Sequence, residues 1–377
     1  MNQIGPQRQL LAASGFIWFF LMGCFVTMSG PAGIALIRKF GLPLDSAPQV
    51  ATSFFIGSMG VIFASAVFSR LFAGVWVPRV CAALYFAGAL IASLSTQWNA
   101  LLLGVGMIGA ANGGLSIWFN AEVAKQFDGP KVGMWLTIVN GFWAVGAICG
   151  PYLLSQFSQT PQIPFWFLCG SAGIGLLMTF GLRQTDQMES ESHDQTSKLP
   201  GRVFGLSLLL GMYVGTESSC IVWMTQHLIS AHGMKLESAA QIGSMVWLAF
   251  AVGRFGSGKM LQRLGAPIFV ATCMAVACGG LLLTMSSTTV VAGYILLGLA
   301  MGPTFPSVIL WGTSLTTQTH KATSIMVIGA AIAAAVFPNL VGSIVANQMS
   351  QLPIVLIVGF GLIVALATAW RKDFVRA

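Results

Sequence analysis

Charged side chains are scarce in this sequence. Lys, Arg, Asp and Glu together make up 7% of the 377 residues, whereas 56% of the residues are hydrophobic and the mean hydropathy is +0.81. A soluble globular domain carries about 25% charged residues. The scarcity of charge excludes a soluble domain and argues against a nucleic-acid-binding protein. It indicates an integral membrane protein.

Several chemical signatures are also missing. The sequence contains no glycine-rich nucleotide-binding loop, no nucleophile elbow and no Cys/His cluster with the spacing of a metal site. The seven cysteines all fall in apolar segments, where we expect them to act as small packing residues. These absences argue against transport driven by nucleotide hydrolysis and against catalysis in the membrane. We predict no enzymatic activity, no cofactor and no metal.

What the sequence has instead is a series of long apolar segments. A helix of about 20 apolar residues spans the hydrocarbon core of a bilayer. Twelve such segments are predicted, at residues 11–37, 47–69, 76–96, 99–121, 133–157, 163–183, 203–230, 236–260, 266–287, 290–312, 322–346 and 352–370. The first is too long for a signal-peptide core and is followed by no small-residue cleavage site, so we expect it to remain as a spanning helix.

One connection between these segments is longer and more polar than the others. Between Arg183 and Arg202 the chain is acidic, rich in serine and without aromatic residues, as expected of a solvated linker. It separates six predicted spans from the next six. We therefore predict an N-terminal bundle at residues 1–184, a cytoplasmic linker at 185–202 and a C-terminal bundle at 203–377.

The two predicted bundles carry matching marks. Arg70 and Arg254 follow the second and eighth segments and are 184 residues apart, while Pro151 and Pro338 lie in the fifth and eleventh segments and are 187 residues apart. Repetition at one nearly constant offset indicates an internal duplication of six helices.

Basic residues are distributed unevenly between the two sides of the membrane. With the N-terminus inside, 15 of the 18 Lys and Arg residues fall in cytoplasmic segments, and only Arg38, Lys39 and Lys235 fall in outer loops. The positive-inside rule then places both termini and the linker in the cytoplasm, with the protein in the inner or plasma membrane. This distribution also accounts for the net charge of +8 without a polyanionic partner.

An acidic residue lies near the middle of the seventh segment. Glu217 is the only acid near the centre of any predicted span. An unpaired carboxylate at membrane depth costs about 2.5–3.5 kcal/mol on insertion scales, so such a residue usually faces a cavity or a partner. It could bind a proton, a cationic group or sugar hydroxyls. We interpret Glu217 as functional, the alternative being a structural acid bonded to neighbouring hydroxyls.

Polar and aromatic residues complete the predicted substrate-binding set. One face of the seventh segment has helical spacing and comprises Thr216, Ser219, Trp223 and Gln226. This face could stack a sugar ring and hydrogen-bond its hydroxyls, and bonding between helices is an equal alternative. The remaining candidates are amide and indole side chains within other segments, namely Asn112, Asn140, Trp143 and Trp247. Amides donate and accept at once, which suits a neutral polyol, whereas packing or interhelical bonding is the alternative.

The tenth segment contains helix-breaking residues. Its sequence Gly302-Pro303-Thr-Phe-Pro306 should kink or loosen the helix. Backbone groups freed at membrane depth are tolerated only where they are buried in protein or line a cavity. Thr304 and Ser307 are therefore weaker candidates for the same site.

The turn after the eighth segment reads Gly253-Arg254-Phe-Gly-Ser-Gly258-Lys259-Met-Leu-Gln-Arg263-Leu-Gly265. Together with two sets of six spans and a cytoplasmic linker, it resembles the major facilitator superfamily. The resemblance implies an all-α membrane protein with twelve transmembrane helices in two pseudo-symmetric six-helix bundles, and a monomer. It also implies gating roles for Arg254, Lys259, Arg263 and Arg70. Positive-inside anchoring is the simpler account of these residues, and both can hold.

Two stretches resemble the fucose–galactose–glucose:proton symporter branch and its fucose-permease-like relatives. They are Tyr213-Val-Gly215-Thr-Glu217 with Trp223, and Asn140-Gly-Phe-Trp-Ala-Val-Gly146 with Gly150-Pro151. The branch implies a sugar or polyol as substrate and a co-transported proton. Its proton-coupling carboxylates in helices one and four are absent here, because residues 20–30 and 109–114 contain no acid. If transport is coupled to a proton, Glu217 is the carrier.

These observations predict a secondary active transporter that moves a small polar solute by alternating access, with a sugar or polyol preferred. No basic residue is expected at mid-depth, so an anionic substrate would lack a countercharge, whereas a cation or amine could pair with Glu217. The alternatives are a proton-driven exporter of amphipathic compounds, favoured by the many Met, Phe and Trp residues, and a receptor or scaffold without transport.

Overall fold

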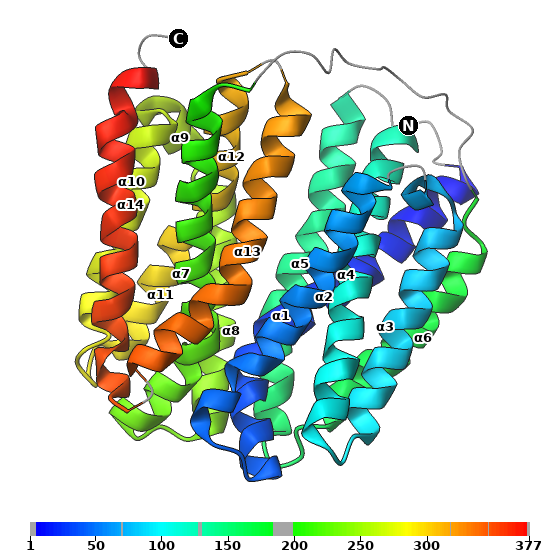
Figure 1. Cartoon of the computed structure of the whole chain (residues 1–377), viewed down its shortest axis with the longest axis horizontal. Coiled ribbons are helices and arrows are strands. Elements are labelled where there is room, and N and C mark those ends of the chain that lie inside the picture. Colours follow the sequence, from blue (N-terminus) through cyan, green and yellow to red (C-terminus); the bar gives the residue numbers. More distant parts are fainter. Residues whose placement is uncertain are drawn as a thin grey trace. The chain divides into compact units, whose positions relative to one another are not determined.

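The computed structural model of the chain describes residues 5–68, 71–126, 130–183, 199–316, 318–345 and 347–374. These residues form α-helices joined by turns and short 3-10 helices, and they contain no strand (Figure 1). Within them, twelve helical segments are long and apolar enough to cross a membrane. The predicted all-α membrane fold with twelve spans is confirmed.

The helices group into two compact units. The first contains α1 (Pro6–Phe40), α2 (Pro48–Val67), α3 (Trp76–Leu94), α4 (Trp98–Gln126), α5 (Pro130–Gln156) and α6 (Ile163–Phe180). The second contains α7 (Gly201–His232), α8 (Leu236–Gly256), α9 (Gly258–Leu264), α10 (Ala266–Leu283), α11 (Val290–Met301), α12 (Thr304–Ser314), α13 (Thr319–Val345) and α14 (Leu352–Phe374). Three short 3-10 helices lie in the connections, at Leu44–Ser46, Leu71–Ala73 and Met349–Gln351.

Small residues allow α1 and α5 to pack closely in the first unit. A methyl group on Gly146 would lie 2.0 Å from the carbonyl oxygen of Phe20, and one on Gly150 would lie 2.2 Å from that of Cys24. Thr27 adds a hydrogen bond of 2.9 Å to the carbonyl of Ala147. Backbones approach in this way where small residues line the contact, because dispersion forces rather than water hold membrane helices together.

The second unit repeats the arrangement of the first. Helix α7 packs along α13 as α1 packs along α5, and α10 packs against α14 and α11 as α3 packs against α6 and α4. The two units are therefore pseudo-symmetric six-span bundles, as the duplicated marks in the sequence predict. They differ at one place that matters for the site. Helix α4 runs without interruption, whereas its counterpart in the second unit is divided into α11 and α12.

Several predicted boundaries are wrong by part of a turn to about one and a half turns. The first span extends from Pro6 to Phe40, and the eighth ends at Gly256 before the separate short helix α9. The fourth helix continues to Gln126 and so includes Glu122, a buried acid whose carboxylate accepts a hydrogen bond of 3.0 Å from the Gln126 amide. An apolar run in the sequence marks only the part of a helix that lies in the hydrocarbon core. It does not include polar turns by which the helix continues into the membrane interface.

Candidate functional site

The break between α11 and α12 follows from two prolines. Proline has no backbone N–H, so Pro303 and Pro306 each remove the donor for the carbonyl four residues earlier. The carbonyl of Gly302 loses its helical partner in this way and instead accepts a hydrogen bond of 3.0 Å from Nε of Arg254. The interruption predicted for this segment is confirmed.

Helix α8 covers both of the freed carbonyl groups. The Leu299 carbonyl, deprived of its donor by Pro303, lies against Gly253, where an added methyl group would be 2.0 Å from the oxygen. The guanidinium of Arg254 lies 4.7 Å from the centre of the Phe250 ring, at a distance typical of a cation–π contact. The backbone groups released at membrane depth are thus buried in protein, as such groups must be.

A tyrosine of α7 reaches the same break and links it to Glu217. The hydroxyl of Tyr213 lies 2.8 Å from the carbonyl oxygen of Met301 and 3.0 Å from Oε1 of Glu217. Tyr213 is completely buried, while Glu217 is partly exposed. The two residues are four apart and so lie on one face of the helix. Arg254 lies within electrostatic reach of both groups.

The number of protons decides what this arrangement can do. A phenol has one proton to donate, whereas Tyr213 faces two acceptors. If Glu217 is protonated, its O–H can donate to the Tyr213 oxygen while Tyr213 donates to the Met301 carbonyl, and every group is paired. If Glu217 is ionised, the carboxylate and the Met301 carbonyl compete for the single Tyr213 proton. The protonation state of Glu217 is therefore linked to the bond between α7 and the broken helix.

The other predicted residues of α7 are bonded elsewhere. Thr216 and Ser219 are buried, and their hydroxyls donate to backbone carbonyls one turn earlier in α7. Trp223 is completely buried, and its indole N–H donates over 2.7 Å to the carbonyl of Pro338 in α13. Gln226 is partly exposed and bonds a serine one turn further along. Trp223 thus makes the interhelical bond that stood as the alternative to sugar stacking.

In the first unit the structure pairs Asn140 with a residue that the sequence did not single out. The exposed amide of Asn140 donates over 2.9 Å to Oδ1 of Asn120 on α4. Asn112 lies about two turns earlier on α4, and its buried Oδ1 has no hydrogen-bond partner among the described residues. Trp143 is partly exposed on α5. A polar side chain exposed within a span belongs beside water or a partner rather than lipid.

The remaining candidates lie on or beside α8. Trp247 is buried, and its ring centre lies 4.8 Å from that of Phe250, so it stands on the face that also carries Arg254. Lys259 and Arg263 are exposed on α9, and Arg70 lies outside the described residues. The hydroxyls of Thr304 and Ser307 bond backbone carbonyls at the break.

Arg254, which the sequence analysis assigns to the turn after the eighth segment, lies in the last turn of α8, and its long side chain reaches a freed carbonyl at the α11–α12 break. A second basic residue, Arg79 on α3, similarly donates to carbonyls at the end of α6. Cations at helix C-termini are favourable because the carbonyls there carry partial negative charge.

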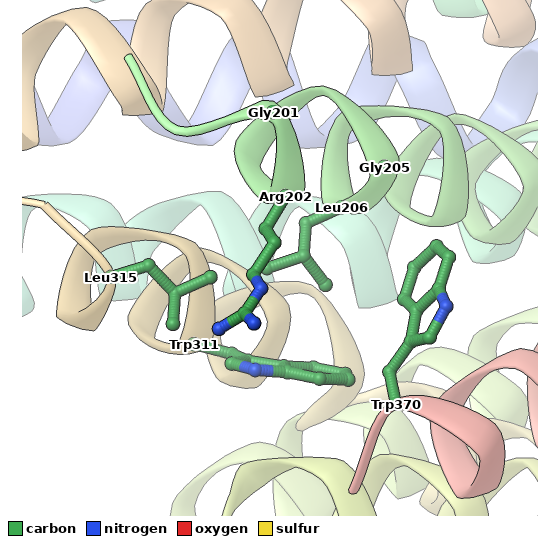
Figure 2. A pocket seen from close by; sticks show the side chains of 7 residues that line it. All are labelled: Gly201, Arg202, Gly205, Leu206, Trp311, Leu315 and Trp370. Carbon is green, nitrogen blue, oxygen red and sulfur yellow. The ribbon is translucent and has the colours of Figure 1, made fainter. Parts of the chain in front are cut away.

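A cavity of about 290 Å³ lies at the N-terminal end of α7 and is separate from the Glu217 site near the middle of that helix. Figure 2 shows the seven residues that line it, which are Gly201, Arg202, Gly205, Leu206, Trp311, Leu315 and Trp370. Arg202 and Glu217 are 15 residues apart, which is about 22 Å along a helix. Within the described residues no cluster of His, Cys, Asp or Glu could hold a metal ion.

A family model for the Major Facilitator Superfamily matches residues 15–338. The chain belongs to this superfamily. The family predicted from the sequence is thereby confirmed, and its members are transporters rather than enzymes. This major facilitator chain is a multi-pass membrane protein with twelve candidate spans in its described residues.

Two curated relatives match part of this major facilitator chain. The Homo sapiens protein described as sodium-dependent glucose transporter 1 is 28% identical over 174 residues, which cover 42% of this chain and 32% of that protein. The Danio rerio protein with the same description is 31% identical over 145 residues, covering 34% of this chain and 23% of that protein. The matched stretch thus spans a third or less of the length of these relatives.

Solved structures show the same fold over nearly the whole chain. The nucleoside transporter NupG has a TM-score of 0.75 at 15% identity and covers 98% of this chain and 99% of its own. The E. coli fucose:proton symporter FucP has a TM-score of 0.64 at 16% identity, with coverage of 96% and 97%. A POT family transporter has a TM-score of 0.80 at 12% identity, with coverage of 98% and 99%. At these identities the likeness establishes the fold.

Proposed function

We propose that this major facilitator protein is a secondary active transporter of a small neutral solute rich in hydroxyl groups, coupled to protons through Glu217. The observation that carries the proposal is the partly exposed carboxyl of Glu217, bonded through Tyr213 to the interrupted helix. An acid within a span that reaches both a broken helix and an arginine has the surroundings of a coupling site.

The class of solute is inferred from the relatives and from the exposed amides. The named relatives are a glucose transporter, a nucleoside transporter and a fucose:proton symporter, whose substrates share a hydroxyl-bearing sugar ring. Asn140 and its partner Asn120 offer donors and acceptors without charge, which suits such a ring. Arg254 is already bonded to the Gly302 carbonyl and lies over Phe250, so we do not assign it an anionic substrate.

The coupling step follows from the proton count at Tyr213. When Glu217 loses its proton, the Tyr213 proton is drawn toward the carboxylate and away from the Met301 carbonyl, which loosens the α11–α12 break from α7. The titratable or charged groups around the pair of Glu217 and Tyr213 are Cys220 on α7, Arg254 on α8 and Cys273 on α10. Alternating access would use this change by opening the protein to one side in each protonation state.

The proposal is tested with purified protein in liposomes and a panel of labelled hexoses, polyols and nucleosides. We expect the wild type to accumulate one of them when a pH gradient is imposed. The Glu217→Gln variant should lose this accumulation but still exchange internal for external solute, because the amide cannot release a proton. A Glu237→Gln variant, which changes an acid in the first turn of α8, serves as the control. Accumulation by Glu217→Gln at the wild-type level would refute the coupling role.

We also infer the placement of the chain in the membrane. The uneven distribution of Lys and Arg supports cytoplasmic termini and a cytoplasmic linker at residues 185–202, between bundles at 1–184 and 203–377. The inner or plasma membrane is the corresponding location, and a monomer is the expected state. Gating by Arg254, Lys259, Arg263 and Arg70 belongs to the same proposal, with Arg254 supported by its bond to the end of α11.

A further inference from the structure

Two histidines lie close together at the C-terminal end of α7. The ring centres of His227 and His232 are 5.0 Å apart, and the ring planes meet at 73°, as in an edge-to-face contact. His227 is only 1% exposed, whereas His232, the last residue of the helix, is partly exposed. Glu217 lies ten residues before His227, which is about 15 Å along a helix, so the histidine pair is separate from the Glu217 site.

The side chain of His232 ties α7 to the connection between α10 and α11. Its Nε2 lies 3.0 Å from the carbonyl oxygen of Thr284, the residue that follows α10, and its Nδ1 lies 2.9 Å from Oγ of Ser287. A carbonyl only accepts, so Nε2 carries a proton. Nδ1 accepts from the serine hydroxyl when His232 is neutral and donates to it when His232 is charged. His232 can therefore take up a proton and keep both of its hydrogen bonds.

The side chain of His227 bonds α11 on different terms. Its Nδ1 lies 2.9 Å from the hydroxyl of Tyr294, which is completely buried. That hydroxyl can donate to Nδ1 only while His227 is neutral, because both ring nitrogens of a charged imidazole are donors. A proton on His227 would also place a charge in a buried position, which is costly. His227 therefore takes up a proton less readily than His232 does.

The ionisable groups on the elements around this end of α7 are few. Within the sequences of the α10–α11 connection at 284–289 and of residues 339–360, where α13 ends and α14 begins, there is none. His232 is the charged group that acts on His227. The remaining ionisable residues are Lys235 and Glu237 at the start of α8, Cys278 on α10, Tyr294 on α11 and Cys220, two turns before His227 on α7 itself. Repulsion between the two imidazoles therefore decides how many protons the pair holds.

We propose that His227 and His232 form a proton-binding site distinct from Glu217, which binds one proton readily and a second one only at lower pH. The first proton goes to His232, where both hydrogen bonds are kept and become charge-assisted. The second would place two like charges 5.0 Å apart and reverse the bond to Tyr294, so that it loosens α7 from α11.

The distribution of basic residues predicts that this end of α7 faces the outside, so that the site responds to external pH. The proposal does not depend on the solute or on proton coupling through Glu217. Both experiments below measure proton binding or stability rather than transport, so their outcome is independent of the proposed function.

The first experiment follows deuterium exchange at the C2 carbon of each histidine by mass spectrometry, in the full-length protein in detergent from pH 5 to 9. This exchange reports the protonation of every histidine separately. We expect His232 to titrate first and His227 at least about 0.6 pH unit below it, the separation that two unit charges 5.0 Å apart produce even at the dielectric constant of water. Equal midpoints for the two histidines of the wild type would overturn the proposal.

His232→Gln removes the neighbouring charge and keeps a polar side chain at the end of α7. We expect it to raise the proton affinity of His227 about fourfold or more, which is the same 0.6 pH unit, and to leave that of His320 unchanged. Ser230→Ala, at an exposed position on the same turn of α7, is the matched control and should leave His227 as in the wild type. An unchanged affinity of His227 in His232→Gln would show that the two histidines do not share a site.

The second experiment compares melting temperatures at pH 7.5 and pH 5. In the unfolded chain the two histidines are apart, so that chain binds the second proton more readily than the folded pair does, and stability falls as the pH is lowered. Acidification should therefore lower the melting temperature of the wild type more than that of His227→Gln, which cannot take up the second proton. An equal fall in the two proteins would contradict the proposed loosening of α7.

Discussion

At the scale of single residues, Tyr213 holds the position on which the proposed coupling depends. Its hydroxyl is the only group among the described residues that bonds both Glu217 and the end of α11. Replacing Glu217 by glutamine keeps a donor for the Tyr213 oxygen, so Tyr213 can continue to bond the Met301 carbonyl. Replacing Tyr213 by phenylalanine removes both bonds. The two substitutions should therefore differ in their effects on stability as well as on transport.

We predict that Tyr213→Phe abolishes the dependence of solute exchange on pH and lowers stability. A buried carbonyl and a carboxyl lose their shared partner, and an unsatisfied buried polar group costs about 1–3 kcal/mol. Exchange rates in liposomes from pH 5.5 to 8.5 and thermal unfolding are the measurements. Glu217→Gln should lower the melting temperature less than Tyr213→Phe does.

Tyr85→Phe is the matched control for this change. Tyr85 is also completely buried, and its hydroxyl donates over 3.2 Å to a backbone carbonyl, that of Leu21 in α1. Its substitution should cost comparable stability and leave the pH profile unaltered. If Tyr213→Phe keeps the wild-type pH profile while Glu217→Gln has lost accumulation, Glu217 carries the proton without Tyr213. If neither variant changes transport, the proposed coupling is wrong as a whole.

At the scale of helices, the interruption between α11 and α12 distinguishes the two units. The equivalent helix α4 contains no proline and runs unbroken from Trp98 to Gln126. In the second unit Pro303 and Pro306 lack a backbone N–H, so the carbonyls of Leu299 and Gly302 have no helical hydrogen-bond donor. Helix α8 covers these carbonyls by a close backbone approach at Gly253 and by a cation at Arg254. Discontinuous helices in transporters characteristically lie at the binding and coupling sites.

Gly253→Ala tests whether the close contact between α8 and α11 is needed. The added methyl carbon would lie 2.0 Å from the Leu299 carbonyl oxygen, so the helices must separate. Overpacking of this kind costs about 1–3 kcal/mol, and we expect a lower melting temperature in detergent. Gly256→Ala lies one turn later with open space around it and should leave the melting temperature unchanged or raise it slightly, because alanine favours helix. A Gly253→Ala protein as stable as Gly256→Ala would show that the contact is dispensable.

At the scale of the whole molecule, the elements that the sequence predicts well are those that it encodes locally. Twelve apolar runs became twelve candidate spans, and the Gly302-Pro303 sequence became the expected interruption. The spacing of Tyr213 and Glu217, four residues apart, was also a usable sign of their hydrogen bond. Pro306, four residues after Gly302, likewise marks a carbonyl that needs a donor from outside its helix.

Other features could not be predicted because they depend on which helices meet. Nothing local indicates that Arg254 supplies the donor for Gly302, or that Met301 is the second acceptor for Tyr213. The pairing of Asn140 with Asn120 rather than Asn112 depends on the register between α4 and α5. Trp223 and Glu217 are six residues apart, so they point in directions about 120° apart; Trp223 bonds the Pro338 carbonyl of α13, whereas Glu217 bonds Tyr213 on α7 itself. Tertiary packing assigns each of these side chains its partner.

The placement of the chain across the membrane is the prediction with the widest consequence, since it decides on which side each proposed gating residue lies. Fifteen of 18 basic residues on one side predict that reporters fused within the linker at residue 193 and at the C-terminus remain in the cytoplasm. In a bacterial host, alkaline phosphatase should be inactive and green fluorescent protein fluorescent at both sites. Alkaline phosphatase inserted after Leu42 or Gly233, beside the basic residues of the outer loops, should be active. Phosphatase activity at residue 193 would reverse the assignment and move Arg254, Lys259 and Arg263 toward the outer face.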